Sequence, residues 1–221
     1  MRRALVLSIP LLLAVPIAYG VAFDRLGHAP MLLPALAGAG GWLLALLLRA
    51  PVGLLGMHLA GTPERAQRWV VASSGPLEEA VRLAVLLLVG RDLGTALWIG
   101  LGWATIEVLY SIGNGFAVAA LAERTDPEAE RARAMLPPAA LAATSPLWGV
   151  VERAWASALH IGFTLILAAV PLLVLVTAPL HTAINVGVLW LARHRGLLVV
   201  SAAGIALGAT VLAAGWLLHV A

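Results

Sequence analysis

The sequence contains no cysteine and no lysine, and only 11% of its 221 residues are charged. Without cysteine, the chain has no disulfide bond, no thiolate metal ligand and no cysteine nucleophile. Without lysine, Schiff-base chemistry and a lysine general base are excluded as well. Soluble globular domains contain about 25% charged residues, so this chain lacks the polar side chains that a water-exposed surface would need. These shortages exclude a cytosolic enzyme, a nucleic-acid-binding module and a disordered protein.

Apolar residues dominate instead, at 62% of the chain with a mean hydropathy of +0.97. Stretches of about 20 apolar residues, enough to cross a bilayer, occur near residues 4–23, 30–50, 70–90, 93–119, 145–169, 171–192 and 197–219. We therefore expect an all-α, polytopic transmembrane bundle of about seven spans that forms one domain over residues 1–221. The first stretch can also be interpreted as a signal peptide. It is longer than the roughly 7–15 apolar residues of such a signal and lacks a clear cleavage site, which favours a span.

The arginines indicate an orientation. Ten of the 14 lie at ends that share one side of the predicted bundle, namely Arg2, Arg3, Arg49, Arg65, Arg68, Arg124, Arg131, Arg133, Arg193 and Arg195. Only Arg25 and Arg91 lie on the opposite side. By the positive-inside rule, the N-terminus is predicted to be cytoplasmic and the C-terminus outside. The same scatter through short loops argues against a nucleic-acid partner, despite the net charge of +3.

Eight ionisable residues nevertheless fall inside the predicted spans: Glu78, Glu79, Arg82, Glu107, Glu152, Arg153, His160 and His181. Each charge at a span centre costs roughly 2.5–3.5 kcal/mol, so such residues face the bundle interior, pair with one another or line a wet cavity. By helical rise they all lie roughly 10–22 Å from the cytoplasmic ends of their spans, which predicts a single layer. A polar network that only holds the helices together is the alternative.

Helical spacing refines this layer. Glu78 and Arg82 share a face, as do His181 and Asn185, and we expect Arg82 to neutralise or orient Glu78. Glu152 lies on a different face of its helix from Arg153, and we expect it to pair with a residue of another helix. Pro76 is expected to open the helical ladder just before Glu78.

Two adjacent carboxylates in a buried site can supply a general base, here Glu78 with Glu79 as its partner. His181 and Asn185 are suited to stabilise an oxyanion. His160 can orient a water or carry its proton, and Glu107 can be a second acid or fix a histidine tautomer.

Four segments in order carry a family resemblance: Glu78-Glu79-x-x-Arg82, Gly100–Tyr110, Glu152–His160 and His181-x-x-x-Asn185. Over residues 70–192 the chain resembles the glutamic-type intramembrane proteases of the superfamily of CAAX prenyl endopeptidases and bacteriocin-processing enzymes, nearest the PrsW and YhfC families. The resemblance implies a water-activating Glu78, a catalytic His160 and an oxyanion pair of His181 and Asn185. It also implies a membrane-embedded or membrane-associated protein substrate and a bacterial cytoplasmic membrane.

One position departs from this pattern, because Trp103 stands where YhfC-type sequences have a histidine. That favours the PrsW pattern and supports a second hypothesis, a non-catalytic scaffold or immunity-type protein of the same fold. A proton-coupled transporter is the third, ranked last because we find no internal repeat. No cofactor is expected, and a Glu/His metal site is left open, although the chain has no His-Glu-x-x-His motif.

Overall fold

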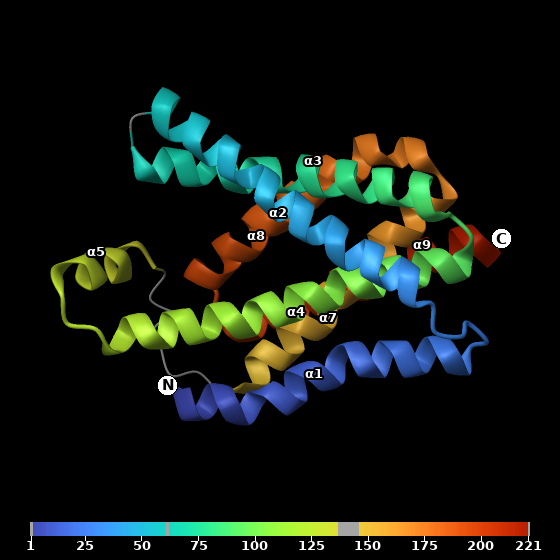
Figure 1. The fold of residues 1–221 in the computed structure, drawn as a ribbon, viewed down its shortest axis with the longest axis horizontal. Helices are drawn as coiled ribbons and strands as arrows, with labels where there is room; N and C mark the ends of the chain where they lie inside the picture. Colours follow the sequence, from blue (N-terminus) through green and yellow to red (C-terminus); the bar gives the residue numbers. More distant parts are fainter. Residues whose placement is uncertain (1, 61, 137–145, 221) are drawn as a thin grey trace.

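The computed structural model describes residues 2–60, 62–136 and 146–220, and these are helical with no strand among them. The all-α expectation is therefore confirmed. Seven of the described helices are long and run back and forth along the molecule, so that α1 begins and α9 ends at opposite ends (Figure 1). The elements are α1 (Arg2–Arg25), α2 (Leu32–Ala60), α3 (Pro63–Val89), α4 (Leu93–Glu123), α5 (Pro127–Met135), α7 (Pro146–Ala169), the short η1 (Pro171–Leu173), α8 (Val174–His194) and α9 (Leu197–Val220).

Six of these helices are long and apolar enough to cross a membrane, namely α1, α2, α4, α7, α8 and α9. Large apolar side chains cover their outer surfaces, and Leu32, Leu172 and Leu175 are each more than 70% exposed. Such a surface is stable in lipid and unstable in water. The helices therefore indicate an integral membrane protein. The remaining long helix, α3, falls outside this set and carries six charged residues: Glu64, Arg65, Arg68, Glu78, Glu79 and Arg82.

The middle of the bundle is built from α7 and α4. Helix α7 packs against α1, α3, α4 and α9, whereas α2 packs against α3 and α4, and α8 packs mainly against α3. Leu97 and Ile99 of α4 meet Ile161 and Leu165 of α7 in one core cluster, and all four are fully buried. These packing partners bring α3, α4, α7 and α8, which carry the predicted site residues, around one interior region.

Small residues allow α2 and α4 to approach closely. A Cβ atom added at Gly102 of α4 would collide with the Ala35 carbonyl, and one added at Gly38 of α2 would collide with the Ile99 carbonyl. In membranes, where apolar burial gives little drive for helices to associate, close backbone packing of this kind supplies van der Waals contact.

We expect Gly102→Val to destabilise the bundle by about 1–3 kcal/mol or more, because the new side chain has no space against the Ala35 backbone. Gly113→Val is the matched control, since Gly113 lies on the same helix with open space around it and costs the same helix propensity. Reversible unfolding in mixed micelles measures both variants. Equal stabilities would show that α2 and α4 do not need this contact.

Two local predictions have different outcomes. The sequence offers Thr125 or Asp126 as the cap of a helix with Pro127 near its first position, and in α5 it is Asp126 that accepts from the Ala129 N–H, at 3.1 Å. The side-chain hydrogen bonds from Arg124, with that backbone N–H, lower the pKa of Asp126 to about 2. Helix α2, in contrast, does not end near residue 50. It continues through Pro51 to Ala60, so Arg49 lies within the helix and not in a cytoplasmic loop.

Candidate functional site: a buried network of carboxylates, histidines and arginines

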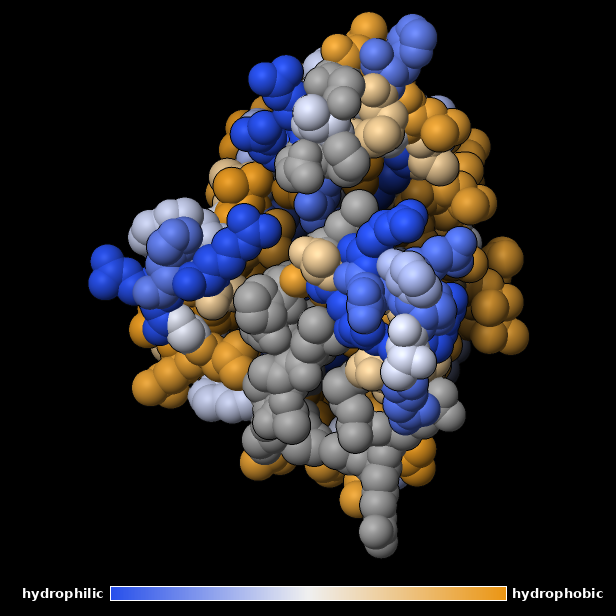
Figure 2. Space-filling view, turned by 90° about the vertical axis from the view of Figure 1, so that its left-hand side faces the viewer, coloured by the Kyte–Doolittle hydropathy of each residue, from blue (hydrophilic) through white to orange (hydrophobic). Residues whose placement is uncertain are grey.

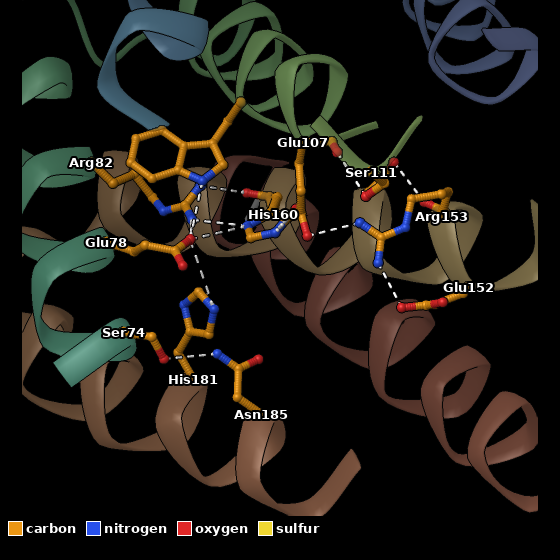
Figure 3. Close-up of polar contacts among 12 residues, drawn as sticks. Ser74, Glu78, Arg82, Glu107, Ser111, Glu152, Arg153, His160, His181 and Asn185 are labelled. Atoms are coloured by element: carbon orange, nitrogen blue, oxygen red, sulfur yellow. Dashed lines mark hydrogen bonds and ion pairs between the residues drawn. The ribbon is translucent and has the colours of Figure 1, made fainter. Parts of the chain in front are cut away.

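The predicted site residues come together in the structure. Figure 3 shows side chains from α3, α4, α7 and α8 pointing toward one another in the bundle interior. Contacts, or for Asn185 a shared pocket, bring together every residue that the sequence singled out for chemistry or support: Glu78, Glu79, Arg82, Glu107, Glu152, Arg153, His160, His181 and Asn185. Figure 3 labels all of these except Glu79. Glu78, Glu79, Arg82, His160 and His181 are all buried, so the layer expected from helical rise is an interior cluster and not a set of lipid-facing charges.

Glu79 lies at the centre of the buried part. Its carboxylate accepts from Arg82 Nε at 3.2–3.3 Å and lies 2.7 Å from His181 Nδ1, and its side chain is fully buried. Arg82 is closer to Glu79 than to Glu78, whose nearest oxygen is 4.0 Å from Arg82 Nη2. The expected Glu78–Arg82 pair is therefore the weaker of the two, because the i,i+3 carboxylate meets the guanidinium edge directly.

Arg82 also ties α3 to α7. Its Nη1 donates to the His160 carbonyl at 3.1 Å and to the Thr164 hydroxyl at 2.9 Å, and its Nη2 lies 3.0 Å from His160 Nδ1. A guanidinium can only donate, so Nδ1 of His160 must accept. Arg82 therefore uses every nitrogen on a partner while having no exposed surface, which is how a buried arginine is stabilised.

His160 has both ring nitrogens engaged. Its Nε2 lies 2.5 Å from Glu107 Oε2, so this nitrogen carries the proton and Glu107 fixes the tautomer. Glu107 in turn binds Arg153 at 2.8 Å, and Arg153 binds Glu152 at 2.7 Å. We expected Glu152 to pair with another helix, but it pairs with its neighbour Arg153, whose side chain reaches it along α7.

Glu78 is buried at the junction of α2, α3 and α4. It forms an ion pair with Arg49 of α2, and its Oε2 accepts from Trp103 Nε1 of α4 at 3.2 Å. The same Oε2 lies 3.9 Å from His181 Nε2 and 4.0 Å from His160 Nδ1. Two groups 3.9 Å apart can both reach one bridging water at about 2.8 Å. Both ring nitrogens of His160 are engaged by other residues. In His181, Nδ1 binds Glu79, whereas Nε2 has no hydrogen-bond partner among the described residues and lies nearest to Glu78.

Ser74 orients Asn185. The Ser74 hydroxyl donates to the Val71 carbonyl at 2.7 Å, so it can only accept from Asn185, whose Nδ2 lies 2.9 Å away. The amide nitrogen must therefore face Ser74, as Figure 3 shows, and this fixes which way the amide points. The second N–H of Nδ2 remains for a ligand.

Helix α3 continues through Pro76, and its hydrogen-bond ladder is open there at one carbonyl. Proline removes the N–H that would bind the Ala72 carbonyl, and the Thr182 hydroxyl of α8 donates to that carbonyl at 3.1 Å instead. Gly75 allows the approach, since a Cβ there would collide with the Ala178 carbonyl. Pro76 therefore provides an attachment point for the helix that carries His181 and Asn185.

A pocket of about 290 Å³ adjoins these groups. Its polar lining includes Glu107, His160, His181 and Asn185, which confirms that His181 and Asn185 share one cavity. Its apolar walls come from α3, α7 and α8, through Val70, Val71, Trp155, Leu159, Phe163, Ile184, Val188 and Leu189.

Exposed cations lie at the end of the bundle where α3 begins and α4 and α8 end, including Arg65, Arg68, Arg124, Arg131, Arg193 and Arg195. Figure 2 shows hydrophilic residues gathered on this end. It is the end that the arginine count assigns to the cytoplasm.

Sequence reasoning missed Arg49, Ser74 and Thr164, which contact predicted site residues, and Thr182, which binds the Ala72 carbonyl before Pro76. The apolar run that continues past Arg49 to Ala60 was a usable signal for Arg49, since it places that charge within a helix. Trp103 was noted only as a departure from the family pattern, and its hydrogen bond to Glu78 was not foreseen.

Glu78, His160 and His181 each present one ligand atom, and these atoms lie within 4.8 Å of one another. Carboxylate and imidazole are common zinc ligands. The group is therefore the candidate metal centre among the described residues.

Comparison with protein-family models, curated proteins and solved structures finds no significant match to this chain. The function must therefore be argued from the geometry of the site.

Proposed function

We propose that the chain is an intramembrane endopeptidase in which Glu78 activates a water. One observation carries the proposal: a buried carboxylate oxygen, Glu78 Oε2, lies 3.9 Å from His181 Nε2, a gap that one water bonded to both atoms can bridge. His181 and Asn185 line an adjoining pocket with apolar walls, and Asn185 Nδ2 has a second N–H besides the one that Ser74 accepts. A base, a water position and donors for an oxyanion are the parts that peptide hydrolysis requires.

The charges of the site favour a protonated His181. Four carboxylates (Glu78, Glu79, Glu107, Glu152) face three guanidiniums (Arg49, Arg82, Arg153), so one imidazolium makes the cluster neutral. With Nδ1–H held by Glu79, the protonated ring points Nε2–H toward the gap.

The reaction then proceeds in two steps. Glu78 takes a proton from the water while the water oxygen bonds to the peptide carbonyl carbon. The resulting oxyanion accepts hydrogen bonds from His181 and Asn185. Glu78 next gives the proton to the leaving nitrogen as the C–N bond breaks, which yields a carboxylic acid and an amine. Glu79, Arg82, His160 and Glu107 hold the reacting side chains in place.

The membrane topology is part of the proposal. We infer seven spans, with α3 as the span that the apolar criterion leaves out, because its 27 residues extend about 40 Å and pack between α2 and α8. Its central charges are buried against neighbouring helices and do not face lipid. The arginine asymmetry places the N-terminus in the cytoplasm, and the resemblance favours a bacterial cytoplasmic membrane.

A protein reconstituted in liposomes with quenched-fluorescent peptides tests the function. Each peptide carries an apolar span, and the set varies the residues near its cytoplasmic-side end. Wild-type protein is expected to cleave members of the set at one bond, identified by mass spectrometry. The Glu78→Gln variant is expected not to.

A non-catalytic binding protein is the second candidate, favoured by the pairing of each carboxylate with a cation. Glu78 has Arg49, Glu79 has Arg82, and Glu107 has Arg153, as in a purely structural network. This candidate predicts that labelled peptides bind and remain intact, with equal affinity in wild type and Glu78→Gln.

The candidate metal ligands fit a cation poorly. Arg82 Nη2 occupies the space next to His160 Nδ1 at 3.0 Å and lies 4.0 Å from Glu78 Oε2, where a metal would meet its positive charge. Arg49 adds a second positive charge on Glu78. These contacts support a mechanism that uses no metal.

We accordingly expect peptide cleavage in liposomes to continue at an unchanged rate after dialysis against EDTA and 1,10-phenanthroline. Elemental analysis of the purified protein should find less than one equivalent of zinc. Loss of activity on chelation, restored by zinc, would contradict this expectation and assign Glu78 and both histidines as ligands. A metal-dependent protease of known sensitivity, treated in parallel, confirms that chelation was complete.

A further inference from the structure

Trp103 has a place in the site that packing alone does not explain. The side chain is fully buried, and its Nε1–H donates to Glu78 Oε2 at 3.2 Å. Indole nitrogen can only donate and does not titrate, so this hydrogen bond is available whatever the protonation of the histidines. Among the described residues, the Trp103 N–H makes the one direct hydrogen bond to Glu78 Oε2. The histidine and arginine nitrogens near this oxygen are 3.9–4.0 Å away.

The ring itself contacts a second site residue. The Arg82 guanidinium carbon lies 4.2 Å from the Trp103 ring centroid, within the range of a cation–π interaction. The same indole therefore holds Arg82, which fixes Glu79 and His160, and Glu78, which faces the water position. The two contacts of this indole therefore connect Glu78 with the group formed by Arg82, Glu79 and His160.

The surrounding sequence makes room for an indole. A Cβ at Gly41 of α2 would approach Trp103 Cζ3 to 2.9 Å, and Trp42, Ala45 and Val81 complete the cluster around the ring.

We propose that Trp103 is a positioning residue, whose N–H fixes the Glu78 carboxylate so that Oε2 faces His181. The catalytic consequence rests on the proposed function, but the positioning itself does not. It predicts that Trp103 senses the charge of Glu78 and that loss of its N–H alone impairs the reaction.

The first measurement needs no activity. In protein labelled with ¹⁵N-tryptophan in micelles, Trp103→Phe identifies the indole signal of Trp103 among the eight tryptophans. Glu78→Gln is expected to move that signal upfield, because a neutral amide accepts more weakly than a carboxylate. Glu130→Gln, an exposed change on α5, is the control. A Trp103 signal that moves no more in Glu78→Gln than in Glu130→Gln would overturn the proposal.

The second measurement uses the liposome assay. Benzothienylalanine at position 103 keeps the ring shape and removes the N–H, so the fold is retained and only the donor is lost. We expect kcat to fall about tenfold or more with KM unchanged. Trp216→Phe, a tryptophan of α9 that packs outside the site, should leave both constants unchanged. Wild-type kcat in the benzothienylalanine protein would refute the positioning role. If wild type cleaves no peptide, the proposed function fails, and the indole signal decides the positioning by itself.

Discussion

Glu78→Gln is expected to lower peptide cleavage by about 100-fold or more, the range that a general base contributes. The substitution keeps the size of the side chain and an oxygen that accepts from Trp103, but the amide cannot take a proton from water. Glu79 is bound by Arg82 and His181, and Glu107 is bound by Arg153 and His160, so we expect neither carboxylate to replace Glu78 as the base. Initial rates in liposomes, with peptide ends identified by mass spectrometry, measure the loss.

Two comparisons keep this result specific. Glu130→Gln makes the same chemical change at an exposed position of α5 and should retain the wild-type rate. Unfolding in micelles must show that Glu78→Gln is folded, since it leaves Arg49 without its carboxylate. A folded Glu78→Gln protein with the wild-type rate would refute the mechanism and favour the binding protein.

Arg82→Met is expected to have the largest effect on stability, about 3–5 kcal/mol of unfolding free energy. It removes the cation beside Glu79 and leaves a fully buried carboxylate without its charge partner. It also frees the His160 carbonyl and the Thr164 hydroxyl, which both accept from the guanidinium. Unfolding by denaturing detergent, followed by circular dichroism, measures the change.

The pairing with Glu79 can be isolated from the size of the side chain. Arg82→Lys keeps the charge but cannot reach Glu79, His160 and Thr164 at once, so its loss should be intermediate. Combining Arg82→Met with Glu79→Gln removes both charges and should recover part of the stability, because a buried pair can be replaced at little cost while a lone charge cannot. Additive losses in the double variant would show that the two residues do not depend on each other.

The helical class and the membrane character followed from composition and from the length of the apolar runs. The interior position of the site followed from the cost of charges in lipid, which requires Glu78, Glu79 and Arg82 to face inward. Faces within one helix were also predictable, as for His181 and Asn185, because helical periodicity depends only on the chain itself.

Partners on other helices were not predictable in this way. Arg82 was expected to pair with Glu78 but binds Glu79 more closely. Glu78 pairs instead with Arg49, which lies in a helix that extends past the apolar run near residues 30–50. Pro76 was expected to open the hydrogen-bond ladder of its helix, but nothing in the sequence indicated that Thr182 of α8 would bind the carbonyl that the proline leaves free. Each of these outcomes depends on how closely two helices approach and in what register.

The sequence by itself determined that this is a helical membrane protein with its few charges gathered inside the bundle. It did so because the free energy of placing charges and apolar side chains in lipid depends on residue type and helical spacing. The tertiary structure alone decided that Trp103 and Arg49 hold Glu78, and that His181 Nε2 lies 3.9 Å from its carboxylate. Those contacts depend on the packing of α2, α4 and α8 around α3 and α7, which no single segment contains.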